Sequence, residues 1–159
     1  MTQTGALREH LVELLRGRNA HVDLETALDG FPAKLRGKKL SGAPYTAWQL
    51  LEHIRIAQWD ILEFSRNPKH VSPAWPDGYW PQTAAPLRPA AWNESVRRVH
   101  ADLKAMQKLV GDKKTKLLAR IPHGTGQTVL REALLLADHN AYHVGQLVLL
   151  RRLLGVWQD

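Results

Sequence analysis

Apolar residues recur every three or four positions through four long segments of the chain, and this spacing constrains the fold more than any other feature. In the third segment the stripe consists of Trp92, Val96, Val99, Leu103, Met106 and Val110. Arg97 and Lys104 fall outside this stripe, as expected for the solvent face of an amphipathic helix. No segment shows a convincing strand-like alternation of apolar and polar residues. The pattern therefore predicts an all-α protein.

Helix-breaking and helix-capping residues divide the chain into the expected elements. The first predicted helix passes through Leu7 to Leu15 and ends near Gly17, and a short amphipathic piece from Val22 to Leu28 follows it. Three further long helices are predicted: the second from Thr46 to Asn67, the third from Trp92 to Val110 and the fourth from Val129 to Leu154.

The segment from Pro68 to Pro89 contains six of the nine prolines, together with Trp75, Tyr79 and Trp80. Proline fixes φ and removes a backbone donor, so we do not expect regular helix here. We expect an ordered crossover whose tryptophans pack onto the helices. A connection of this length usually has a function, such as covering a site, so its aromatic residues are candidates for a pocket wall as well as for simple packing.

Four long helices joined by one long crossover predict a four-helix bundle. Because 159 residues are close to the usual size of one domain, we expect residues 1–159 to form a single domain. No apolar run approaches the roughly 20 residues that span a bilayer, and the first residues lack the pattern of a secretory signal. The expected location is therefore the cytoplasm, with no membrane partner.

The chain has no cysteine and a formal net charge of +7. Any metal ion must therefore be bound by nitrogen and oxygen atoms, and any thiol chemistry needs a thiol from outside. The basic residues form separate groups with acidic residues interspersed on the helices, for example Lys113 with Lys114 and Arg151 with Arg152. We interpret them as a solvated basic surface, with a dedicated nucleic-acid patch as the alternative.

Three histidines fall on apolar helix faces. His53 shares its face with Leu50 and Ile61, and the pair His139 and His143 lies within the apolar stripe of the fourth helix. A spacing of four residues places the two imidazoles of this pair one turn apart on the same face. Three nitrogen ligands from two helices leave open positions on a divalent ion, which is typical of a catalytic metal site.

The alternative interpretation is that these histidines are hydrogen-bonded core residues. Three buried polar rings without partners would each cost on the order of 1 to 3 kcal/mol, and metal coordination removes much of that cost, so we favour the metal site. Glu132 and Asp138 are candidates for carboxylates that orient an imidazole, or for surface residues. For the other histidines we expect solvent exposure: His10, His21, His70, His100 and His123.

The segment ADHNAYHVGQLVLLRRLLGVW resembles the last helix of the DinB-like (YfiT-like) superfamily of metal-dependent enzymes, and LLEHIRIAQWDILEF resembles its second helix. This resemblance implies a four-helix bundle, often dimeric, that binds nickel, zinc or a related divalent ion through His53, His139 and His143. Gly145 and Gln146 match the end of the family motif. The glycine is interpreted either as allowing close approach of another segment or as a tolerated helix glycine.

The family resemblance favours a metal-dependent hydrolase or thiol-dependent transferase that acts on a small molecule. Relatives of this kind use bacillithiol or mycothiol, and one is a maleylpyruvate isomerase, so an exogenous low-molecular-weight thiol is an expected cofactor. The alternative is a non-catalytic metal-binding or stress-related helical bundle. We expect no specific binding of nucleic acid, and a homodimer is an expectation from the resemblance alone.

Overall fold

The computed structural model describes residues 2–157. Its regular secondary structure over that range is helical, apart from one isolated β-bridge between Arg120 and Thr128. The described elements are α1 (Gln3–Arg16), α2 (Leu24–Leu28), a 3₁₀ helix η1 (Ala33–Leu35), α3 (Ala47–Arg66), a second 3₁₀ helix η2 (Asp77–Tyr79), α4 (Pro89–Gly111) and α5 (Val129–Leu153). The predicted all-α class is confirmed, and the observed helix ends lie close to those expected from the sequence.

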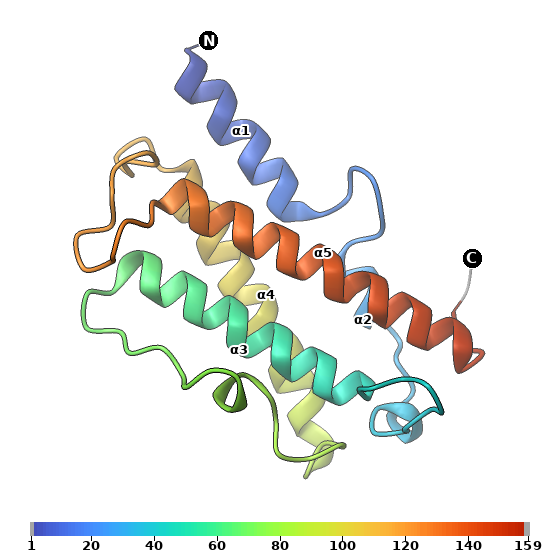
Figure 1. Ribbon diagram of the computed structural model, residues 1–159. Helices are drawn as coiled ribbons and strands as arrows, with labels where there is room; N and C mark the ends of the chain where they lie inside the picture. The colour runs from blue at the N-terminus through green and yellow to red at the C-terminus, as the bar shows by residue number, and fades with distance from the viewer. Residues whose placement is uncertain (1, 158–159) are drawn as a thin grey trace.

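The four long helices α1, α3, α4 and α5 form the bundle, and the short helix α2 packs against α5 (Figure 1). Helix α3 packs against both α4 and α5, and it runs antiparallel to α5 along its side (Figure 1). The predicted four-helix bundle with a long crossover between its second and third helices is therefore confirmed. Among residues 2–157, no helix combines the length and the apolar character that crossing a membrane requires.

The apolar core consists of two clusters along the bundle. One is built around Leu51, Ile54 and Leu147, and the other around Leu62 and Leu136, all of them buried. Along α3 and α5 the boundary between the two clusters is occupied by polar side chains. The functional site described below includes His139 and His143 from this stretch of α5 and His53 from the edge of the stretch on α3.

Helix α3 begins with a capping box, and this cap also anchors the crossover. The Thr46 side chain accepts a hydrogen bond from the backbone N–H of Gln49, and the Gln49 side chain accepts one from the backbone N–H of Thr46. The Thr46 hydroxyl in turn donates to the carbonyl of Ala84 at 2.6 Å. The start of α3 is therefore tied to the far end of the crossover.

The crossover between α3 and α4 follows the side of α3, with η2 as its one helical turn (Figure 1). Trp80 packs onto α3 as predicted, because its ring stacks on His53. The same prediction is wrong for Trp75, whose side chain is 76% exposed. Trp75 contacts Tyr79 edge-on instead, within the crossover itself.

The interpretation of Arg151 and Arg152 as part of a solvated basic surface is wrong for Arg151. This residue is buried, and its guanidinium donates hydrogen bonds to the carbonyls of Ala27 at 3.0 Å and of Asp29 at 2.6 Å. These carbonyls lie at the C-terminal end of α2, where backbone acceptors lack partners within the helix. Arg151 therefore fixes α2 against α5.

Substitution Thr46→Ala should lower the free energy of unfolding by about 1 to 2 kcal/mol, because it removes the N-cap of α3 and the bond to Ala84. Urea denaturation measures this change. The matched control is Thr4→Ala, at an exposed position inside α1, which should stay within about 0.5 kcal/mol of the wild type. Equal stability of the two variants would contradict this account of the cap.

Candidate metal centre

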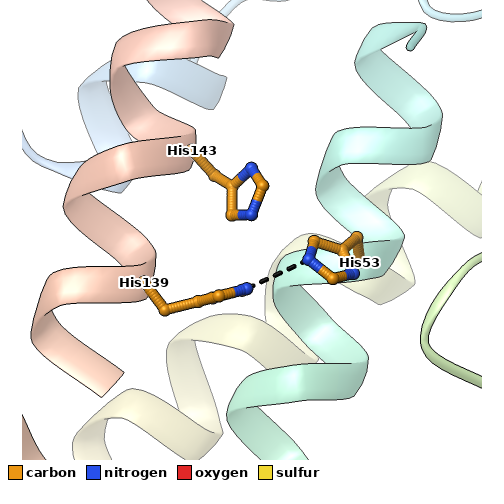
Figure 2. Close-up of side chains that lie close together, drawn as sticks. All are labelled: His53, His139 and His143. Carbon is orange, nitrogen blue, oxygen red and sulfur yellow. Dashed lines mark hydrogen bonds between the residues drawn. The ribbon is translucent and has the colours of Figure 1, made fainter. Parts of the chain in front are cut away.

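Three imidazole rings meet between α3 and α5 (Figure 2). His53 comes from the second turn of α3, and His139 and His143 come from successive turns of α5. One ring nitrogen from each histidine can be chosen so that all three lie within 4.8 Å of one another. A hydrogen bond joins Nε2 of His53 to Nε2 of His139 at 3.0 Å, and Figure 2 shows the third ring beside this pair.

The crossover fixes the orientation of the His53 ring. Its Nδ1 lies 2.9 Å from the carbonyl oxygen of Tyr79, and because a carbonyl can only accept, His53 Nδ1 carries the proton. The neutral ring therefore presents the lone pair of Nε2 to the centre of the cluster. Trp80 stacks on the same ring, with the ring centroids 3.9 Å apart and the planes almost parallel, and shields that face from water.

Gln146 holds the His143 ring in a similar way. The Nδ1 of His143 donates to Oε1 of Gln146 at 2.7 Å, one turn further along α5. This bond leaves Nε2 of His143 available as a ligand atom. Two of the three rings therefore have their outer nitrogen paired and their other nitrogen free for coordination.

The third ring, His139, lies next to a buried chain of side-chain amides. The amide nitrogen of Gln58 donates to the carbonyl of Val99 at 2.6 Å. The side-chain oxygen of Gln58 therefore faces the opposite direction, where it accepts a hydrogen bond from the amide nitrogen of Asn140 at 2.8 Å. The oxygen of Asn140 then remains as an acceptor on the α5 side. Neither this oxygen nor Nδ1 of His139 has a hydrogen-bond partner within residues 2–157, and both are buried.

Burial and mutual repulsion keep the rings neutral. Burial lowers the pKa of His139 to about 3, with further lowering from His143 and His53, while the Asn140 side chain opposes it. Burial also lowers the pKa of His53, opposed by the Tyr79 carbonyl, and that of His143, opposed by Gln146. The cluster therefore offers unprotonated nitrogens near neutral pH, which is the form that binds a metal ion.

Comparison with known proteins now adds the family. A family model described as the DinB superfamily matches residues 16–147. The chain belongs to the DinB superfamily. Curated proteins and solved structures give no significant match. The resemblance seen in the sequence of the last and second long helices is confirmed by this family match.

The imidazole set of this DinB-superfamily protein fits a divalent ion. Zinc lies about 2.0 to 2.1 Å from a histidine nitrogen, so two ligands on one ion are separated by roughly 3.0 to 3.4 Å. The 3.0 Å separation of His53 and His139 matches this value. The third nitrogen lies within 4.8 Å of the other two. The role of His53, His139 and His143 as ligands is still a prediction.

Other residues of the DinB-superfamily protein differ from the expectations. Glu132 is buried but pairs with Arg131, and Asp138 is exposed, so neither is seen to orient an imidazole. A Cβ added to Gly145 would meet nothing within 4 Å, so no segment of residues 2–157 approaches it closely, which favours the tolerated helix glycine. His70 was expected in solvent, but its side chain is only 5% exposed because it bonds to Asp60.

Sequence reasoning missed three of the groups that surround the rings, the Tyr79 carbonyl and the side chains of Gln58 and Asn140. The Tyr79 carbonyl carries no side-chain signal, and Gln58 and Asn140 are polar residues whose pairing across two helices no spacing rule predicts. A usable signal was present only for the amides, because each interrupts an otherwise apolar helix face.

Stability of the metal-free DinB-superfamily protein should fall as the pH drops below about 6.5, the ordinary pKa of histidine in an unfolded chain. In that range histidines of the unfolded chain bind protons, whereas the buried rings of the folded protein stay neutral, since the pKa of His139 in the folded state is about 3. Each ring can contribute at most about 1.4 kcal/mol per pH unit. Urea denaturation with a chelator, between about pH 8 and pH 5, measures the slope. The stability of the variant His139→Asn should depend less steeply on pH. Identical slopes for the variant and the wild type would contradict the lowered pKa of His139 in the folded state.

Proposed function

We propose that this protein is a metal-dependent enzyme, of the hydrolase or thiol-dependent transferase type, that acts on a small molecule at the three-histidine site. The observation that carries the proposal is the meeting of three neutral, largely buried imidazoles from two helices. Three imidazoles suit nickel and zinc among the first-row ions, and they leave coordination positions for a further ligand. DinB-superfamily membership is compatible with such a metal-binding protein.

A divalent ion bound at such a site lowers the pKa of a water or thiol, which supplies a nucleophile near neutral pH. The residues of the chain prepare the site for this chemistry. The Tyr79 carbonyl and Gln146 hold two rings with Nε2 directed to coordination, and Trp80 excludes water from one face of His53. Because the chain has no cysteine, a thiol nucleophile would have to be an external low-molecular-weight thiol.

A groove next to the site supports a small-molecule substrate. It has a volume of about 270 Å³ and is lined mainly by apolar residues, including Leu50, Leu149 and Leu153. Gln146, which bonds to His143, also lines this groove. Gln146 is thus the contact between the groove and the proposed ligands, although none of the three histidines lines the groove itself. A single-domain, cytoplasmic protein is part of this proposal, and a homodimer stays a prediction from the family resemblance.

Protein purified without a histidine tag should contain close to one equivalent of nickel or zinc, and His143→Ala should lose most of it, because one of three ligands is removed. Elemental analysis of both proteins measures the content. The matched control is His123→Ala, since His123 lies outside the cluster and bonds to the carbonyl of Phe64. Unchanged metal content in His143→Ala would exclude the site.

Catalysis by an external thiol predicts that metal-loaded protein accelerates consumption of bacillithiol or mycothiol in the presence of an electrophilic small molecule. Consumption of the thiol is followed with a chromogenic reagent, and chelated protein and His143→Ala should both lose the acceleration. Hydrolysis of a chromogenic ester panel tests the hydrolase type in the same samples. Loss of thermal stability on metal removal, with no turnover of any substrate, would instead favour a non-catalytic metal-binding protein.

A further inference from the structure

The crossover is attached to α3 through one buried carboxylate. Asp60 lies seven residues after His53 on α3, and its side chain accepts two hydrogen bonds from the crossover. One comes from the hydroxyl of Tyr79 at 2.6 Å, and the other joins Nε2 of His70 at 2.7 Å. Each carboxylate oxygen therefore holds a different point of the crossover.

Tyr79 links this carboxylate to the proposed metal ligand. Its hydroxyl bonds to Asp60, its carbonyl accepts the Nδ1 proton of His53, and the next residue, Trp80, stacks on the same ring. The side chain and the main chain of one residue thus contact α3 two turns apart. Movement of the Tyr79 hydroxyl away from Asp60 would also shift the carbonyl that orients His53.

We propose that Asp60 is a positioning residue that acts through Tyr79: it holds the Tyr79 carbonyl and the Trp80 ring in place against His53. The inference rests on the proposed metal site and concerns how one of its ligands is held. A carboxylate is suited to this task because it accepts hydrogen bonds on both oxygens and bonds more strongly than a neutral acceptor. Burial and the hydrogen bond to Asp60 both raise the pKa of Tyr79, so its hydroxyl stays protonated and remains a donor.

The crossover does not depend on Asp60 alone for its attachment. At its far end, the Thr46 hydroxyl donates to the carbonyl of Ala84, and the indole N–H of Trp48 donates to the hydroxyl of Thr83 at 3.3 Å. Loss of the bond between Asp60 and Tyr79 should therefore leave the crossover in place. Its main effect should be on how closely the Tyr79 carbonyl is aimed at His53.

The decisive variant is Tyr79→Phe, which removes the hydroxyl and keeps the ring and the carbonyl. The matched control is Tyr142→Phe, because Tyr142 also lies beside a ring of the cluster, edge-on to His143, but is mostly exposed, and within residues 2–157 the hydrogen bonds of Asp60 go to His70 and Tyr79 instead. Two readouts are needed. The first is exchange of the His53 Nδ1 proton with solvent in metal-free protein, followed by NMR. The second is the Zn²⁺ dissociation constant from competition with a chelating dye.

In Tyr79→Phe, the His53 Nδ1 proton should exchange roughly 3- to 10-fold faster and Zn²⁺ should bind roughly 3- to 10-fold more weakly, the effect expected when one net hydrogen bond of a supporting shell is lost. Tyr142→Phe should match the wild type in both. Asp60→Asn should change both in the same direction as Tyr79→Phe, and the double variant should be no worse than the more affected single variant. Core amide exchange, measured in the same samples, corrects for any change in global stability.

Wild-type proton exchange and wild-type Zn²⁺ affinity in Tyr79→Phe would overturn the proposal, and so would weaker Zn²⁺ binding without faster exchange at His53. The exchange measurement does not require metal. If the wild type bound no Zn²⁺ while Tyr79→Phe still exchanged its His53 proton faster, the positioning role of Asp60 would stand and the proposed metal-dependent function would fail.

Discussion

The site depends on the burial of three imidazole rings in a helical bundle. His53 and His143 are about 95% buried, and a buried polar ring needs a partner for each nitrogen. The crossover and Gln146 satisfy the outer nitrogens of these two rings, whereas Nδ1 of His139 is buried without a hydrogen-bond partner within residues 2–157. The remaining nitrogens face one another. In the metal-free protein Nε2 of His139 donates to Nε2 of His53, and a shared cation in place of that proton would be a partner for all three nitrogens together.

Two features of the bundle bring the rings to one place. The antiparallel helices α3 and α5 lie side by side (Figure 1), so His53 in the second turn of α3 faces His139 and His143 in the middle of α5. The boundary between the two apolar clusters then accommodates polar side chains without interrupting either cluster. Gln58 and Asn140 fill this boundary and pair with each other, which leaves the core intact around them.

The basic composition is used partly inside the fold. Arg151 binds carbonyls at the end of α2, Arg8 donates to the carbonyl of Val110 at 2.7 Å, and Arg36 lies over the ring of Trp92. These guanidinium groups serve as donors to backbone acceptors and as partners for an aromatic ring. The net charge of +7 therefore does not describe one continuous surface, although a solvated basic exterior remains our interpretation of the other groups.

The sequence by itself determined the helices and the three candidate ligands. Apolar spacing, the Thr46 cap and the proline-rich crossover follow from local rules, because helical periodicity and capping involve residues at most a few positions apart. Only the tertiary structure decided which groups hold the rings. The bonds from His53 to Tyr79, from Tyr79 to Asp60 and from Asn140 to Gln58 join residues 19 to 82 positions apart. Such pairs carry no periodic signal, since they form only when packing brings separate segments together.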